Sequence, residues 1–151
     1  MVTRKLSPKQ FFTQEEKDQI VRAIQKAEHK TSGEIRVYLE RKAKGDVIAH
    51  AKKVFEKLKM TQTKHRNGIL VYFSLHSHDF AILGDQGIHE KVGNNFWEDI
   101  ASKMQGLFSK DDFSGGLEVG ISEVGERLKK YFPRESGDIN ELSNEVSSDR
   151  P

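Results

Sequence analysis

The sequence contains no cysteine and only three prolines in 151 residues. Without cysteine the chain has no disulfide bonds, no thiol catalysis and no thiolate zinc sites. No apolar run reaches the ~18 residues of a membrane-spanning helix, and the N-terminus lacks the apolar segment of a secretory signal. We therefore expect a cytoplasmic protein without a membrane span.

The charges are also nearly balanced, with 25 basic and 23 acidic residues and a net charge of +2. This balance gives no indication of a nucleic-acid partner, which would require a clustered basic surface. The length suits one domain with its own core. We predict a basic N-terminal arm over residues 1–10, a folded domain over 11–134 and an acidic mobile tail over 135–151.

Familiar catalytic motifs are missing as well. The chain has no phosphate-binding loop of the Walker type, no Gly-x-Gly-x-x-Gly after a strand and no Gly-x-Ser-x-Gly turn. No histidine has a recognisable triad context. The sequence therefore gives no positive support for nucleophilic catalysis, and whether the protein is an enzyme stays open.

The centre of the fold is predicted from residues 67–85. Ile69–Phe73 is an unbroken apolar run of strand length, typical of a strand that is covered on both faces. The polar residues 76–79 interrupt it, and Phe80–Leu83 resumes it. The stretch predicts a β-hairpin whose first arm lies inside a sheet.

The other elements follow from periodicity. Residues 34–40 alternate apolar and polar side chains as a strand does. Apolar residues at helical spacing predict a first helix that starts after Thr13 and ends at residues 30–33, and further helices over about 47–58, 96–108 and 113–128. Gly116 and Gly120 in the last helix indicate close packing against a neighbour. Strand, helix and strand form a parallel unit with a right-handed crossover. The order predicts a three-layer α/β/α sandwich around a small mixed sheet of at least three strands.

Several separated segments together resemble the TPM domain family over roughly residues 12–132, most closely its small stand-alone bacterial members. The resemblance is carried by residues 32–37 (SGEIRV), 67–72 (NGILVY), 82–88 (ILGDQGI) and the glycine-bearing last helix. It implies an α/β/α sandwich with about four strands, one more than the periodicity predicts, so we expect a small mixed sheet of three to four strands. A thylakoid-lumen member in photosystem II repair is associated with acid phosphatase activity, and divalent-metal binding is attributed to the fold.

Topology predicts a candidate metal site. If the first two strands are parallel and the third runs back, the side chains of Glu34, Asn67 and Asp85 meet at one edge of the sheet, beside Ser32 and Gln86. Carboxylate, amide and hydroxyl oxygens are ligands for hard cations, so Ca²⁺ or Mg²⁺ is the expected cofactor. The alternative is that Glu34 is an exposed strand-end charge and that Asp85 is a turn residue.

Asp111 and Asp112 are weaker candidates for the same metal chemistry, as a carboxylate pair that ligates a cation or activates water. The alternative is a helix cap, because Ser109–Asp112 has the form of a capping box.

The opposite edge of the sheet carries His76, His78, Asp46 and Asp79. Two histidines separated by one residue suit zinc, copper or nickel in principle. A solvated hairpin tip is the simpler interpretation, since no third clear ligand follows.

Three functions remain open. The first is a divalent-cation-binding TPM domain that acts as a binding or interaction module, with an unidentified protein partner. The second is a metal-assisted acid phosphatase that hydrolyses phosphomonoesters. The third is a purely structural partner-binding domain without a site.

Overall fold

A computed structural model describes residues 7–93, 95–134 and 146–148. The helices are α1 (Gln14–Glu28), α2 (Val47–Lys57), α3 (Gln86–Val92), α4 (Glu98–Phe108) and α5 (Phe113–Tyr131); the strands are β1 (Glu34–Glu40), β2 (Gly68–Ser74), β3 (Phe80–Gly84) and β4 (Ser147–Ser148). All the predicted elements are confirmed. The structure adds the short helix α3 and the two-residue strand β4.

The strands form one sheet in the order β3-β2-β1-β4. β1 and β2 are parallel, and β3 pairs with β2 in the antiparallel direction. The predicted mixed sheet is therefore confirmed. β4 is the additional strand, and it pairs in parallel with Tyr38 and Leu39 of β1.

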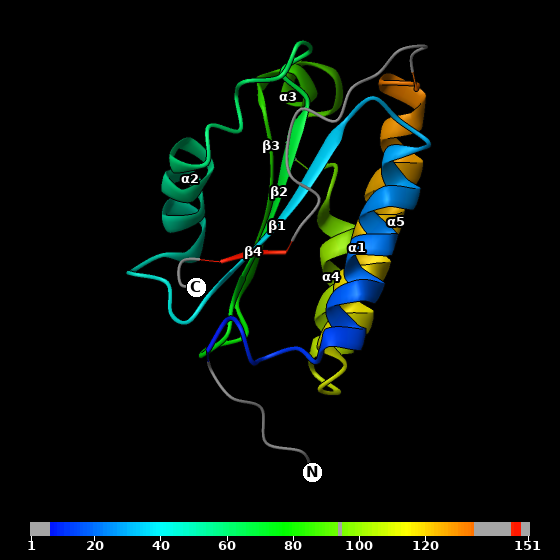
Figure 1. The fold of residues 1–151 in the computed structure, drawn as a ribbon. Helices are drawn as coiled ribbons and strands as arrows, with labels where there is room; N and C mark the ends of the chain where they lie inside the picture. Colours follow the sequence, from blue (N-terminus) through cyan, green and yellow to red (C-terminus); the bar gives the residue numbers. More distant parts are fainter. Residues whose placement is uncertain (1–6, 94, 135–145, 149–151) are drawn as a thin grey trace.

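Helices cover both faces of this sheet, so the fold is a three-layer α/β/α sandwich (Figure 1). Alternate strand residues point to opposite faces. The residues of one face, among them Ile35 and Val71, belong to the main core beneath α1, α4 and α5. The residues of the other face, among them Tyr38, Leu70 and Tyr72, pack in a smaller core with α2. Burial on both faces explains why β2 is apolar throughout rather than alternating.

The glycines of α5 allow α4 to approach closely. A Cβ atom on Gly116 would lie 2.4 Å from the ring of Phe108, and one on Gly120 would lie 2.4 Å from the sulfur of Met104. Glycine inside a helix costs about 1 kcal/mol relative to alanine. The close contact between the two helices offsets this cost, as the sequence predicted.

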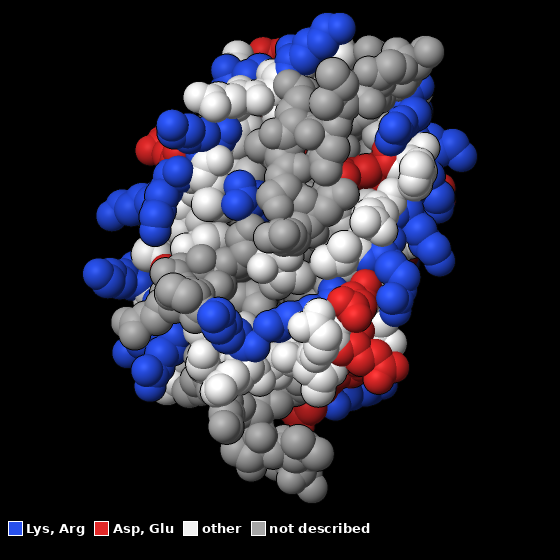
Figure 2. Space-filling model, in the orientation of Figure 1, with Lys and Arg blue, Asp and Glu red and all other residues white. Residues whose placement is uncertain are grey.

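The predicted terminal segments fall mostly outside the described residues. Residues 1–6 and 135–145 are not described, so the arm and the mobile tail stay predictions; Val146 packs against the main core. Lys and Arg side chains gather over α2, on the left in Figure 2. Within the described ranges, no helix is both long and apolar enough to cross a membrane.

Candidate functional site

The strand directions bring Glu34 and Asp85 to the same edge of the sheet. Glu34 begins β1 and lies opposite Gly68, the first residue of β2. The backbone N–H of Asp85 donates to the carbonyl of the same Gly68 at 2.9 Å. Glu34, Gly68 and Asp85 therefore form one row across three chain segments.

The alternation of the strands places this row on the face that α2 covers. Leu70 is two residues from Gly68 and Leu83 is two residues from Asp85, so each points to the same face of the sheet as its neighbour in the row. Both leucines belong to the smaller core. Two strand spacings separate the outer members of the row by about 10 Å. The central Gly68 has no side chain, so nothing on β2 stands between the two carboxylates at this level.

Asp85 is buried, with only 4 % of its surface exposed, and its carboxylate is paired with Arg66. Arg66 donates from Nε to Oδ2 at 2.7 Å and from Nη2 to Oδ1 at 2.9 Å. The backbone N–H of Gln86 also donates to Oδ1 at 2.7 Å, so Asp85 caps α3. This bidentate pair, reinforced by a helix N-terminus, is a strong arrangement for a carboxylate.

The loop before β2 positions Arg66. Its backbone has a positive φ of 50°, and its carbonyl accepts from the N–H of Gly87 at 2.9 Å. The hydrogen bond to Asp85 raises the pKa of Arg66 above its ordinary value. The side chain nevertheless stays 45 % exposed. Sequence reasoning missed this partner; the only signal was the basic run over residues 64–66.

Asn67 is buried at the same edge. Its side-chain Nδ2 lies 3.4 Å from the hydroxyl of Ser32, and its backbone carbonyl accepts from the N–H of Glu34 at 3.3 Å. The structure thus brings Asn67, Ser32 and Glu34 together. Glu34 itself is 4 % exposed, so it is not the exposed strand-end charge of the alternative interpretation.

Asp111 and Asp112 lie at the other end of the sheet. The next residue is Phe113, whose ring centroid lies 5.8 Å from that of Phe73. Phe73 is near the end of β2, whereas Gly68 is its first residue. Asp112 is the N-cap of α5, and its carboxylate accepts from the N–H of Gly115 at 3.0 Å. The predicted capping box from Ser109 is wrong, because that residue caps the C-terminus of α4 instead.

The histidine pair at the hairpin tip does not converge. The ring of His78 packs against that of Phe113 in a tilted arrangement, with ring centroids 4.6 Å apart, whereas His76 is exposed. Asp46 caps α2 through the N–H of Ala49 at 2.9 Å. In residues 7–93, 95–134 and 146–148, no three His, Asp or Glu side chains are placed to hold a metal.

A second polar cluster, which the sequence did not indicate, lies at the end of β1. Glu40 accepts from the hydroxyl of Tyr72 at 2.6 Å and pairs with Nε2 of His50. The side chains of Glu40 and His50 are each 14 % exposed. Tyr72 lies within the apolar run of β2, and His50 lies on a helix that follows a loop. The spacing of Glu40, His50 and Tyr72 in the sequence therefore gave no sign that they meet.

Comparison with known proteins agrees with this fold. The TPM domain family matches residues 7–127. One similar solved structure is the NMR structure of the BA42 protein from the psychrophilic bacterium Bizionia argentinensis. It is 44% identical, covers 91% of this chain and 95% of its own, and superposes with a TM-score of 0.86. No curated protein matches the chain. The chain belongs to the TPM domain family.

Proposed function

We propose that this TPM domain binds a divalent cation, Ca²⁺ or Mg²⁺, at Asp85 and acts as a cation-responsive binding module for another protein. The observation that carries the proposal is the unequal burial of the Asp85–Arg66 pair. The carboxylate is 4 % exposed, whereas its arginine partner is 45 % exposed and lies at the surface. An exposed guanidinium is a counter-ion that a dissolved cation is able to replace.

The side chains at this edge fit a cation that takes few protein ligands and keeps several bound waters. In the structure, Arg66 donates hydrogen bonds to both carboxylate oxygens of Asp85. A cation therefore requires Arg66 to move away. Mg²⁺ usually keeps several waters and takes only one or two carboxylates from the protein. Asp85, with Glu34 in the same row, suits this mode, and water would supply the remaining ligands.

The test is a cation titration of metal-stripped protein by calorimetry and thermal melting. Cation at about 100 times its dissociation constant adds about 2.7 kcal/mol of stability, which raises the melting temperature by roughly 5–10 °C. Asp85→Asn should abolish the rise. Arg66→Gln should tighten cation binding about tenfold, because it removes a competing interaction worth about 1.4 kcal/mol.

Arg127→Gln is the matched control. Arg127 also pairs with an aspartate, Asp99, but on α5 and α4 rather than at the sheet edge. It should leave cation affinity unchanged. If no cation saturates the wild type or Arg66→Gln, the site does not exist and the structural partner-binding function is favoured.

One observation also favours the second function, metal-assisted phosphomonoester hydrolysis. Arg66 brings a guanidinium, a good ligand for phosphate, to the same edge as the candidate cation site. Turnover of p-nitrophenyl phosphate with Mg²⁺ is the assay. A phosphatase should lose turnover in both Asp85→Asn and Arg66→Gln, whereas a binding module should show cation binding without turnover in any variant.

A further inference from the structure

One edge of the sheet is closed by a strand, and the other is open. In the strand order β3-β2-β1-β4, β4 covers the outer side of β1. β3 lies at the opposite edge and, among the described strands, pairs only with β2. Its five residues, Phe80–Gly84, include no charged residue and no proline, and their register with β2 is unbroken. The β3 edge therefore lacks the features that usually prevent an edge strand from pairing.

Two hydrogen bonds at the ends of the β2–β3 ladder show which backbone groups of β3 face outward. The N–H of Asp85 donates to the carbonyl of Gly68 at 2.9 Å, and the N–H of Ser74 donates to the carbonyl of Asp79 at 2.8 Å. Since hydrogen-bonded pairs alternate along an antiparallel ladder, the odd-numbered residues of β3 face β2. The even-numbered residues direct both N–H and C=O away from the sheet; they are Phe80, Ile82 and Gly84. In the described part of the chain, no other element bonds to the backbone of these three outward-facing residues.

A groove of about 260 Å³ follows this open edge. The consecutive strand residues 80–83 line it, so it runs along the side of the strand and not over one face of the sheet. Ile48 of α2 flanks it on one face, and Trp97 and Ala101 at the start of α4 flank it on the other. Ile48 is 50 % exposed, and Glu98, the one charged residue of the lining, is exposed as well. The outward backbone groups thus lie between two apolar walls, which suits another strand.

We propose that two copies of this protein pair through β3, in the antiparallel direction and with a two-fold axis at Ile82. All three outward-facing residues then form hydrogen-bonded pairs, which gives about six backbone hydrogen bonds. In this register Phe80 of one copy lies opposite Gly84 of the other, and Leu83 lies opposite Ala81, so a large side chain meets a small one on each face. A shift by two residues would place Phe80 against Ile82 and leave Gly84 without a partner in β3. The strand itself, reversed, supplies the complementary order of sizes, and a second copy is therefore the occupant that this edge selects.

The test is the association state of the full-length protein, measured by sedimentation equilibrium. A short strand and its two flanking walls form a small interface, so we expect a reversible dimer between about 10 μM and about 1 mM. Amide hydrogen exchange, followed by NMR, reports the register. The amides of the three outward-facing residues should gain about tenfold protection as the concentration rises, whereas those of Ala81 and Leu83 should be protected throughout. Trp97 is the only tryptophan in the chain, so its emission should shift to shorter wavelength over the same range.

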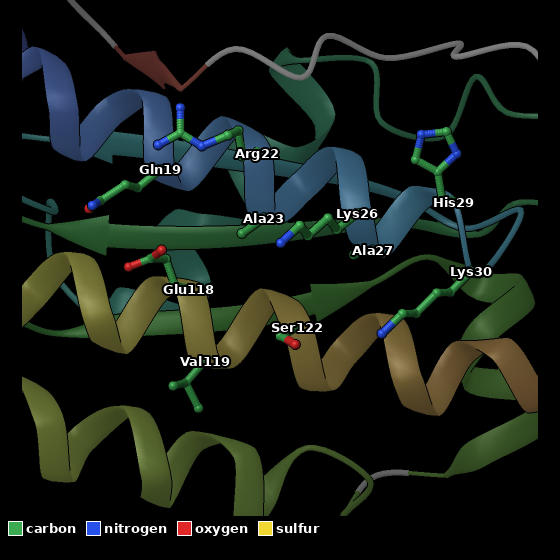
Figure 3. Close-up of a pocket in the computed structure, with 10 residues that line it drawn as sticks. All are labelled: Gln19, Arg22, Ala23, Lys26, Ala27, His29, Lys30, Glu118, Val119 and Ser122. Atoms are coloured by element: carbon green, nitrogen blue, oxygen red, sulfur yellow. The ribbon is translucent and has the colours of Figure 1, made fainter.

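Two substitutions alter the walls of the groove and leave the strand unchanged. Ala101→Arg fills the groove from α4, and Ile48→Lys replaces an exposed apolar side chain with a charged one. Each should weaken dimerisation about tenfold, a change of about 1.4 kcal/mol. Ala23→Arg is the matched control, because Ala23 is also half-buried on a helix but lines a different groove, between α1 and α5 (Figure 3). It should leave dimerisation unchanged.

The proposal is overturned if the wild type stays monomeric at about 1 mM, or if a dimer forms in which the Ile82 amide exchanges as fast as in the monomer. Protection of Ile82 that arises only when an extended peptide is added would also overturn it, because the occupant would then be a strand of another protein. Equal weakening by Ala23→Arg and Ala101→Arg would contradict pairing at this edge.

Discussion

Gly87 is the position where one methyl group should disturb the candidate site most. A Cβ atom there would lie 2.3 Å from the carbonyl oxygen of His65 and 2.7 Å from that of Arg66. Both neighbours are backbone atoms, so no side-chain rotation relieves the clash. The loop would have to move away from α3, which would break the 2.9 Å hydrogen bond from Gly87 N–H to Arg66.

The expected cost of Gly87→Ala follows from these contacts. Overpacking costs about 1–3 kcal/mol, and a lost hydrogen bond costs about 0.5–1.5 kcal/mol. We expect a loss of about 2–4 kcal/mol in the free energy of unfolding, measured by urea denaturation. The displaced loop should also weaken the pairing of Arg66 with Asp85.

Gly106→Ala is the control, because Gly106 lies in α4 and a Cβ atom there would have no neighbour within 4 Å. Alanine at this position should stabilise the protein by about 0.5–1 kcal/mol. A Gly87→Ala protein as stable as the wild type would refute the close approach of α3 to the loop that carries Arg66.

Three further predictions concern parts of the fold outside this loop. Asp112→Ala should lower the free energy of unfolding by about 1 kcal/mol in urea melts, because it removes the N-cap of α5; no loss would show that this cap is dispensable. A hydrogen bond from Arg127 lowers the pKa of Asp99 to about 2. Since this is below the unfolded value of about 3.9, the stabilisation is present above about pH 4 and is lost as the pH falls toward 2. Asp99→Asn should therefore flatten the pH dependence of stability over this interval, and an unchanged slope would contradict the pairing. Tyr72→Phe should cost about 1–2 kcal/mol in thermal melts, because it removes the hydroxyl that donates to Glu40 at 2.6 Å; an unchanged melting temperature would argue against that bond.

The main layers could be predicted from the sequence because they depend on local patterns. The apolar run of β2 and the alternation of β1 each indicate how a strand is buried, and the connecting helix then fixes their parallel direction. The shared edge of Glu34 and Asp85 followed from these directions alone. The family resemblance implied a fourth strand, but the position of β4 could not be predicted, because Ser147 and Ser148, which pair with β1, carry no hydrophobic pattern.

The partner of Asp85 was beyond sequence reasoning for a different reason. Arg66 reaches it only because its own backbone adopts a positive φ and because Gly87 allows α3 to approach that loop. Neither condition is visible in residue spacing. The same holds for the pairing of Glu40 with His50, which depends on how the loop between β1 and α2 turns.

The most direct test of the cation site is the NMR signal of the Arg66 Nε–H group, assigned with the Arg66→Gln variant. In the cation-free protein this proton is hydrogen-bonded to Asp85, so it should be shifted and protected from exchange with water. Addition of Mg²⁺ or Ca²⁺ should move it to the position of a solvent-exposed arginine, saturably, with no change in the Arg127 signal. An Arg66 signal that stays protected at saturating cation would contradict the account, because Asp85 would then be a structural cap of α3 and not a ligand.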